Sequence, residues 1–221
     1  LVRTIALSRT FRMSSAHDEI AHTVDPENAL LWRANRRRLD PEALRDSMLA
    51  AAGTLDLKPM DSTVWYLGDQ ATAVGANTNR RRTDFPCRSV YLPVIRNDLP
   101  EIFDVFNFAD PQAGTGMRPN TMVATQGLFL MNDESVVSAA QQTARRILED
   151  APSQDPDVVA TVLFRMLFQD EGSEQLREPV VHYVLKVQQL PAETEETDPN
   201  HNAWTLAVQA LFASSRFQIL E

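Results

Sequence analysis

Apolar residues recur along much of the chain at the spacing of one helical face. After Asp155 and Asp198 they fall three and four residues apart, at Val158, Val159, Val162, Leu163, Met166 and Leu167, and at Ala203, Leu206, Ala207, Ala210 and Leu211. The same spacing predicts a helix from about 133 to 149, opened by Asn132, with Val136, Val137, Ala140, Ala144, Ile147 and Leu148 facing inward. Ser173 and the stretch 176–187 predict another helix.

Aspartate followed by proline punctuates this pattern at five places: Asp25-Pro26, Asp40-Pro41, Asp110-Pro111, Asp155-Pro156 and Asp198-Pro199. An aspartate side chain accepts hydrogen bonds from the amides at a helix start, and proline fits the first helical position. Four of these pairs precede helical periodicity and predict helix starts. The pair at 110–111 is followed by "QAGTGMRPN" and predicts a turn.

The stretch "NRRRLDPEALRDSMLAAAGTLD" predicts that one helix ends at Leu39 and that Asp40 caps the next, which Gly53 closes in a left-handed turn. At ~100° per residue, this second helix has an apolar arc of Leu44, Met48, Leu49, Ala51, Ala52 and Leu55. Arg45 falls inside that arc, so we expect it to be a buried structural charge that meets a carboxylate. Arg36, Arg37 and Arg38 would span almost a full helical turn, so they cannot all face one ligand.

The middle of the chain, 60–119, differs from the flanking helical parts. It contains isolated glycines, the polar run "NTNRRRTD" and the stretch "RSVYLPV", which predicts a short strand that Pro93 restricts to a sheet edge. We therefore predict a mainly α fold: a bundle-like helical domain with an irregular central insertion containing a short β-strand or ribbon. The whole of 1–221 is expected to be one domain, with a helical body of 1–53 and 122–220 and the insertion at 60–119.

Charge and composition exclude several classes of function. The chain has 221 residues, a mass of 24.8 kDa and a formal net charge of −9, which disfavours a general nucleic-acid binder because phosphate contacts rely on positive charge. No apolar run approaches the ~20 residues that span a bilayer. The chain is long enough to bury a core without disulfides, and its one cysteine, Cys87, cannot form one internally.

Motif spacing gives no support for metal, haem or hydrolase chemistry. "HDEIAH" departs from the zinc-binding H-E-x-x-H pattern, and on a helix His17 and His22 would point ~140° apart. Neither C-x-x-C-H nor any pair of cysteines occurs, so the chain is expected to hold no covalent haem and no structural zinc. No G-x-S-x-G, G-x-G-x-x-G or phosphate-binding loop is present either.

Several ordered motifs resemble one family. They are "SRTFR" from Ser8, "DPENALLWRANRRRLDPEALRDSMLAAAGTLD" from Asp25, "RSVYLPVIR" from Arg88, "FNFADP" from Phe106, and "RPNTMVATQGLFLMND" from Arg118, with "AWTLAVQALFASSRFQIL" near the end. Together they are similar to the planctomycete cytochrome-associated domain of unknown function. The resemblance implies the C-terminal part of a large exported protein whose N-terminal region carries a cytochrome c type haem site, so any haem would belong to that other part.

The chain departs from the family pattern at two places. Asn107 stands where an aspartate is expected in an "FDFPDP"-like motif, so a catalytic carboxylate there is not supported. Near the family's "R-x-P-x-x-E"-like stretch this chain has "FQDEGSEQL", with Arg165 displaced upstream.

Two functions from different classes follow. The first, which the sequence favours, is a non-catalytic helical scaffold or interaction module that contacts other domains of the same exported protein. The alternative is a polysaccharide-binding or polysaccharide-degrading domain. Its cleft would be lined by side chains that hold sugar hydroxyls or carboxylates: Arg88, Tyr91, Arg96, Asp110, Arg118 and Gln126.

Overall fold

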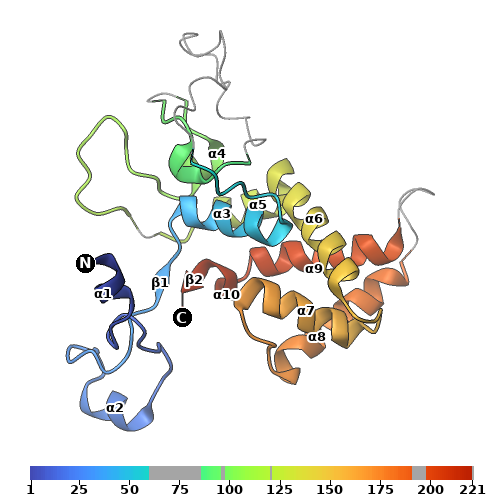
Figure 1. Ribbon diagram of the computed structural model, residues 1–221, viewed down its shortest axis with the longest axis horizontal. Coiled ribbons are helices and arrows are strands. Elements are labelled where there is room, and N and C mark those ends of the chain that lie inside the picture. The colour runs from blue at the N-terminus through green and yellow to red at the C-terminus, as the bar shows by residue number, and fades with distance from the viewer. Residues whose placement is uncertain (60–85, 96–97, 120, 191–197, 221) are drawn as a thin grey trace.

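The structure is a computed structural model that describes residues 1–59, 86–95, 98–119, 121–190 and 198–220. Within them, ten α-helices, one short 3₁₀ helix and a two-stranded antiparallel sheet confirm the predicted mainly α class (Figure 1). The elements are α1 Val2–Ala6, α2 Glu19–Val24, β1 Arg37–Arg38, α3 Pro41–Ala52, η2 Ser89–Tyr91, α4 Glu101–Val105, α5 Ala124–Asn132, α6 Glu134–Asp150, α7 Pro156–Phe168, α8 Glu174–Gln188, α9 Pro199–Phe212, α10 Ser215–Gln218 and β2 Ile219–Leu220.

The long helices begin where local capping signals predict. Asp155 and Asp198 cap α7 and α9 with their carboxylates, which accept from the amides of Asp157 and Asn200. Helix α6 begins one residue later than predicted, because Asp133 caps it and Asn132 is the last residue of α5. The predicted stop of α3 is confirmed, since Gly53 adopts a left-handed conformation with φ 73°.

Two helix predictions in the N-terminal part are wrong. Asp25 ends α2, and no helix follows it: its carboxylate accepts hydrogen bonds from the amides of Ala29 and Leu30 and shapes a turn. Leu39 does not end a helix either, since Arg37 and Arg38 form strand β1 and pair with Leu220 and Ile219. The helical placement predicted for the three arginines is therefore wrong. Pairing between strands so far apart in the sequence leaves no local signal from which it could be predicted.

The strand predicted over 88–94 is also wrong. Ser89 to Tyr91 form the 3₁₀ helix η2, and Cys87 makes only an isolated parallel bridge with Asp56. The β-like composition of this stretch reflects packing: Leu92 is buried, Tyr91 packs against the core, and Pro93 limits backbone pairing. The only two-stranded pairing in the described residues is that of β1 with β2.

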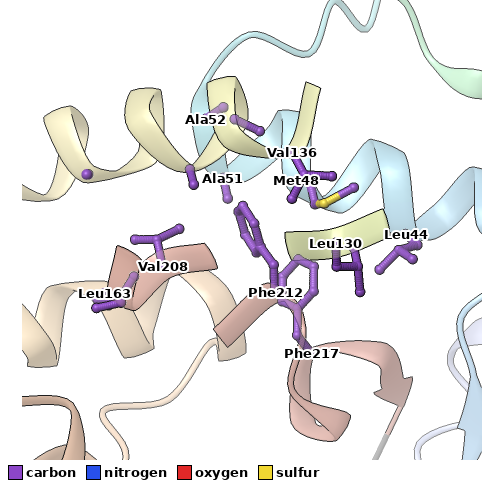
Figure 2. Packing of buried hydrophobic residues seen from close by; sticks show 14 of the residues in the cluster. Leu44, Met48, Ala51, Ala52, Leu130, Val136, Leu163, Val208, Phe212 and Phe217 are labelled. Atoms are coloured by element: carbon purple, nitrogen blue, oxygen red, sulfur yellow. The ribbon is translucent and has the colours of Figure 1, made fainter. Parts of the chain in front are cut away.

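One hydrophobic cluster joins most of the helices. Helix α6 packs on α3 and α9, α9 packs on α8, and α8 on α7. Leu44 and Met48 of α3 meet Leu130 of α5, and Phe212 and Phe217 carry the cluster across α9 and α10, their ring centroids 4.8 Å apart (Figure 2). Removing these side chains from water supplies the main driving force for folding.

The described part of the insertion contributes to the same core. Cys87, Leu92, Phe103 and Phe106 belong to the cluster, while 60–85 and 96–97 lie outside the described residues. By contrast, no member of the cluster precedes Leu39. Figure 1 shows the segment 1–36, with α1 and α2, projecting from the helical body near the β1–β2 pair. That 1–221 is a single domain stays a prediction.

Candidate functional site

Arg45 lies on the inner side of α3, with 7% of its surface exposed. Its guanidinium donates to the carbonyl oxygen of Cys87 at 3.0 Å and to Ser89 Oγ at 3.2 Å, and it lies 3.7 Å from Asp46 Oδ1. That Asp46 oxygen also accepts from the amide and the hydroxyl of Ser89. Burial lowers the pKa of Arg45, while the neighbouring Asp46 charge opposes that shift. The group fastens η2 to α3.

Arg88 and Arg118, two of the six predicted cleft residues, line one cavity of about 440 Å³. Its wall also carries three carboxylates: Asp40, Glu42 and Asp46. Arg118 forms a two-pronged pair with Glu42 at 2.7 and 2.8 Å, which raises the pKa of Arg118. Its guanidinium carbon lies 4.9 Å from the ring centroid of Phe108. Arg88 is half exposed and its Nε lies 3.9 Å from Asp46 Oδ2.

Three of the other four predicted cleft residues do not line this cavity. Gln126 is 3% exposed; its amide donates to the carbonyl oxygen of Val105, and its Oε1 accepts from the amide of Val123 at the start of α5. Tyr91 packs against the hydrophobic core. Asp110 is exposed, and its carboxylate accepts from a backbone amide of the turn predicted there. Arg96 lies outside the described residues.

A second and larger cavity, of about 740 Å³, adjoins the first and shares Asp40 and Arg118 with it. Strand β1 contributes Arg37 and Arg38 to its wall. Arg38 donates to the carbonyl oxygen of Thr121, to Gln126 Oε1 and to Gln218 Oε1, at 2.6, 2.9 and 2.8 Å. Arg38 was not among the residues predicted to line a site. Its partners lie 83 to 180 residues away, and only the run of three arginines drew attention to the position.

The two histidines of "HDEIAH" are closer than the helical projection predicts. Their ring centroids lie 4.9 Å apart because α2 begins at Glu19, so that His17 lies outside the helix. His22 Nδ1 is buried and has no hydrogen-bond partner among the described residues, and His17 Nε2 lies 3.6 Å from Glu19. Across the described ranges, no group of three or more histidine, cysteine, aspartate or glutamate side chains could hold a metal ion.

None of the helices in the part of the chain that the structure describes has the length and apolar character needed to cross a bilayer. The comparisons with known proteins gave one match. The sequence model of a protein of unknown function, PSD1 or DUF1553, matches residues 1–184. The chain belongs to this family. DUF1553 is the planctomycete cytochrome-associated C-terminal domain family, as the motifs indicated, and it is associated with exported proteins. No curated protein and no solved structure matched the DUF1553 chain.

Proposed function

We propose that this DUF1553 domain is an interaction module whose segment 1–36 docks against another domain of the same parent protein. The observation that carries the proposal is the exposed apolar surface of that segment. Nine large hydrophobic side chains among its first 31 residues are at least 51% exposed: Leu1, Val2, Ile5, Leu7, Phe11, Ile20, Val24, Leu30 and Leu31.

Polar contacts, not a core, hold this segment in shape. Asn28 is buried and bridges the carbonyl of Arg33 and the side chain of Asn35. The indole of Trp32 donates to the carbonyl oxygen of Asp25, and the amide of Ala34 donates to that of Ser14. A segment organised in this way keeps its apolar side chains outward, and large exposed apolar patches mark contact surfaces.

Family membership and charge point to a neighbouring domain as the occupant. A C-terminal domain family has further protein before it in the same polypeptide, and a tethered neighbour binds at high effective concentration. Residues 1–17 include Arg3, Arg9 and Arg12 and no acidic residue, in a chain with net charge −9. The expected partner surface is therefore apolar, with acidic groups where it faces residues 1–17.

Hydroxyl-radical footprinting of the native side chains tests this role. Oxidation of Phe11 and Ile20 is measured in the full parent protein and in the 221-residue chain alone. We expect at least a fivefold slower rate in the parent, because a neighbouring domain covers them. Leu176 of α8, 44% exposed, is the matched control and should react equally in both.

Equal rates for Phe11 and Ile20 in the two proteins would disprove the docking. Protection that appears in the isolated chain as its concentration rises would also disprove it, because the occupant would then be a second copy. A matched pair of variants adds a stability measurement. Phe11→Asp in the parent protein should lower its melting temperature, and Leu176→Asp should not.

The polysaccharide alternative is supported by one observation, the shared cavity of Arg88 and Arg118 with its three carboxylates. Side chains of this kind bind sugar hydroxyls. Binding of a neutral oligosaccharide to the chain, lost in Arg88→Ala, would favour it over the docking role. Export of the parent protein is part of the proposal, rests on the family association, and is tested by fractionating cells for the native protein.

A further inference from the structure

Arg38 is a charged group whose structural partners are all neutral. The oxygens of Thr121, Gln126 and Gln218 accept three hydrogen bonds from its Nη1 and Nη2. A guanidinium has five N–H donors, so two of them, including Nε–H, have no acceptor within the described residues. Gln126 and Gln218 are 3% and 7% exposed, and each is anchored by a further bond to a backbone carbonyl. The guanidinium is therefore held in a fixed orientation.

The charge around the cavity of about 740 Å³ is not balanced. Arg37 is paired with Asp40 at 3.1 Å, and Arg118 with Glu42. Arg38 has no carboxylate within 4.0 Å in the part of the chain that the structure describes, and burial lowers its pKa with no acidic neighbour to oppose it. Arginine stays protonated nonetheless. Among the described residues, one positive charge in the wall is left uncompensated.

Size and lining restrict what could balance this charge. A cavity of about 740 Å³ falls in the range of pockets for small organic ligands and is far larger than a simple ion. Its wall combines the face of Phe106, whose ring centroid lies 5.3 Å from the Arg38 guanidinium carbon, with Met117 and the polar Asn107. Asp40, in the same wall, repels a second negative charge on a ligand.

We propose that this cavity binds the carboxylate of a small organic acid, with Arg38 as the anion-binding group. The planar fork of an arginine matches a carboxylate, and a monoanion balances the single unpaired charge. The remainder of the ligand lies against Asn107 if it carries hydroxyl groups, and against Phe106 and Met117 if it is apolar. This site is independent of the docking of segment 1–36.

Isothermal titration calorimetry on the 221-residue chain tests the site with two probes. D-glucuronate represents a sugar acid and phenylacetate an apolar acid, and D-glucose and phenylacetamide are their uncharged counterparts. We expect at least one acid to bind tenfold or more tightly than its uncharged counterpart. The acid that binds more tightly shows whether the site prefers a sugar acid or an apolar acid. Inorganic phosphate and sulfate are titrated in parallel.

Three variants keep the result interpretable. Arg38→Lys keeps a charge but loses the fork, and should weaken the acid at least fivefold. Asp40→Asn removes the repelling charge and the carboxylate partner of Arg37. It costs α3 no cap hydrogen bond, because the Asp40 side chain makes none, and it should tighten binding severalfold. Arg165→Gln, on the exposed surface, should change nothing.

The proposal is overturned by any of three results. Neither acid binds more tightly than its uncharged counterpart; phosphate or sulfate binds as tightly as the better acid, which would mean a general anion patch; or Asp40→Asn leaves the affinity unchanged. The last variant does not alter the three Arg38 hydrogen bonds, so it tests the charge balance even if Arg38→Lys fails to fold.

Discussion

Replacing Arg45 by alanine tests whether the buried contact between α3 and η2 stabilises the fold. The guanidinium supplies donors to the Cys87 carbonyl and to Ser89 Oγ, at a position 7% exposed. A buried acceptor that loses its donor costs about 1 to 3 kcal/mol. Loss of two buried methylene groups of the stem adds roughly 1.5 kcal/mol.

The carboxylate left behind contributes less than it would in a dry interior. Asp46 keeps both hydrogen bonds from Ser89, and its side chain is 19% exposed, so water and Arg88 can compensate in part. Breaking a fully buried pair costs ~3–5 kcal/mol. For Arg45→Ala we therefore expect a loss of about 3 to 4 kcal/mol in the free energy of unfolding.

Urea unfolding followed by circular dichroism measures the effect, with Arg165→Ala as control. Arg165 pairs with Glu171 on the surface, where its side chain is 59% exposed, and exposed pairs contribute about 1 kcal/mol or less. Arg45→Met, which keeps the aliphatic length, should recover roughly 1 to 2 kcal/mol of the loss. Small and equal losses in Arg45→Ala and Arg165→Ala would refute the assignment of Arg45 as a structural buried charge.

Three further outcomes are expected. Gly53→Ala should lower stability by about 1 to 2 kcal/mol in thermal melts, because φ is 73° and the new Cβ would lie 2.9 Å from Arg146 Cδ; Gly114→Ala, with open space around it, should be neutral. Cys87 is 2% exposed and burial raises its pKa, so Ellman's reagent at pH 8 should react only after unfolding in urea. Asp155→Ala should cost ~1 kcal/mol by removing the cap of α7, measured by urea midpoint.

The parts of the fold that the sequence predicted are those with local causes. Helix α3 begins after Asp40, with Pro41 as its first residue, and ends at Gly53, with an apolar face between them; the Asp40 side chain itself makes no cap hydrogen bond. The β1–β2 pair joins Arg37 to Leu220 and Arg38 to Ile219, 183 and 181 positions apart, and has no such signal. Over 88–94 the β-branched and aromatic residues look like a strand, yet the Asp46 side chain takes the Ser89 amide that a strand partner would need.

The residues of the candidate site also differ in whether local sequence or long-range packing decides their placement. Inward placement of Arg45 followed from helical geometry, because each position on a helix has a defined direction. Gln126 looked like a ligand-binding residue, but it is occupied by Arg38 and the Val105 carbonyl. Composition can indicate that a polar side chain is available, whereas its actual partner is decided by long-range packing.

The hydrogen bond between Arg38 and Gln218 also sets an order of events during synthesis. The two residues are 180 positions apart, so at about 5 to 20 residues per second the acceptor is made roughly ten to forty seconds after the donor. During that interval α3 to α9 can emerge from the ribosome and pack. The segment 1–36, ahead of β1, is not yet held by the contact of Arg38 with Gln218. Chaperones or a preceding domain would therefore meet its apolar side chains first on the ribosome.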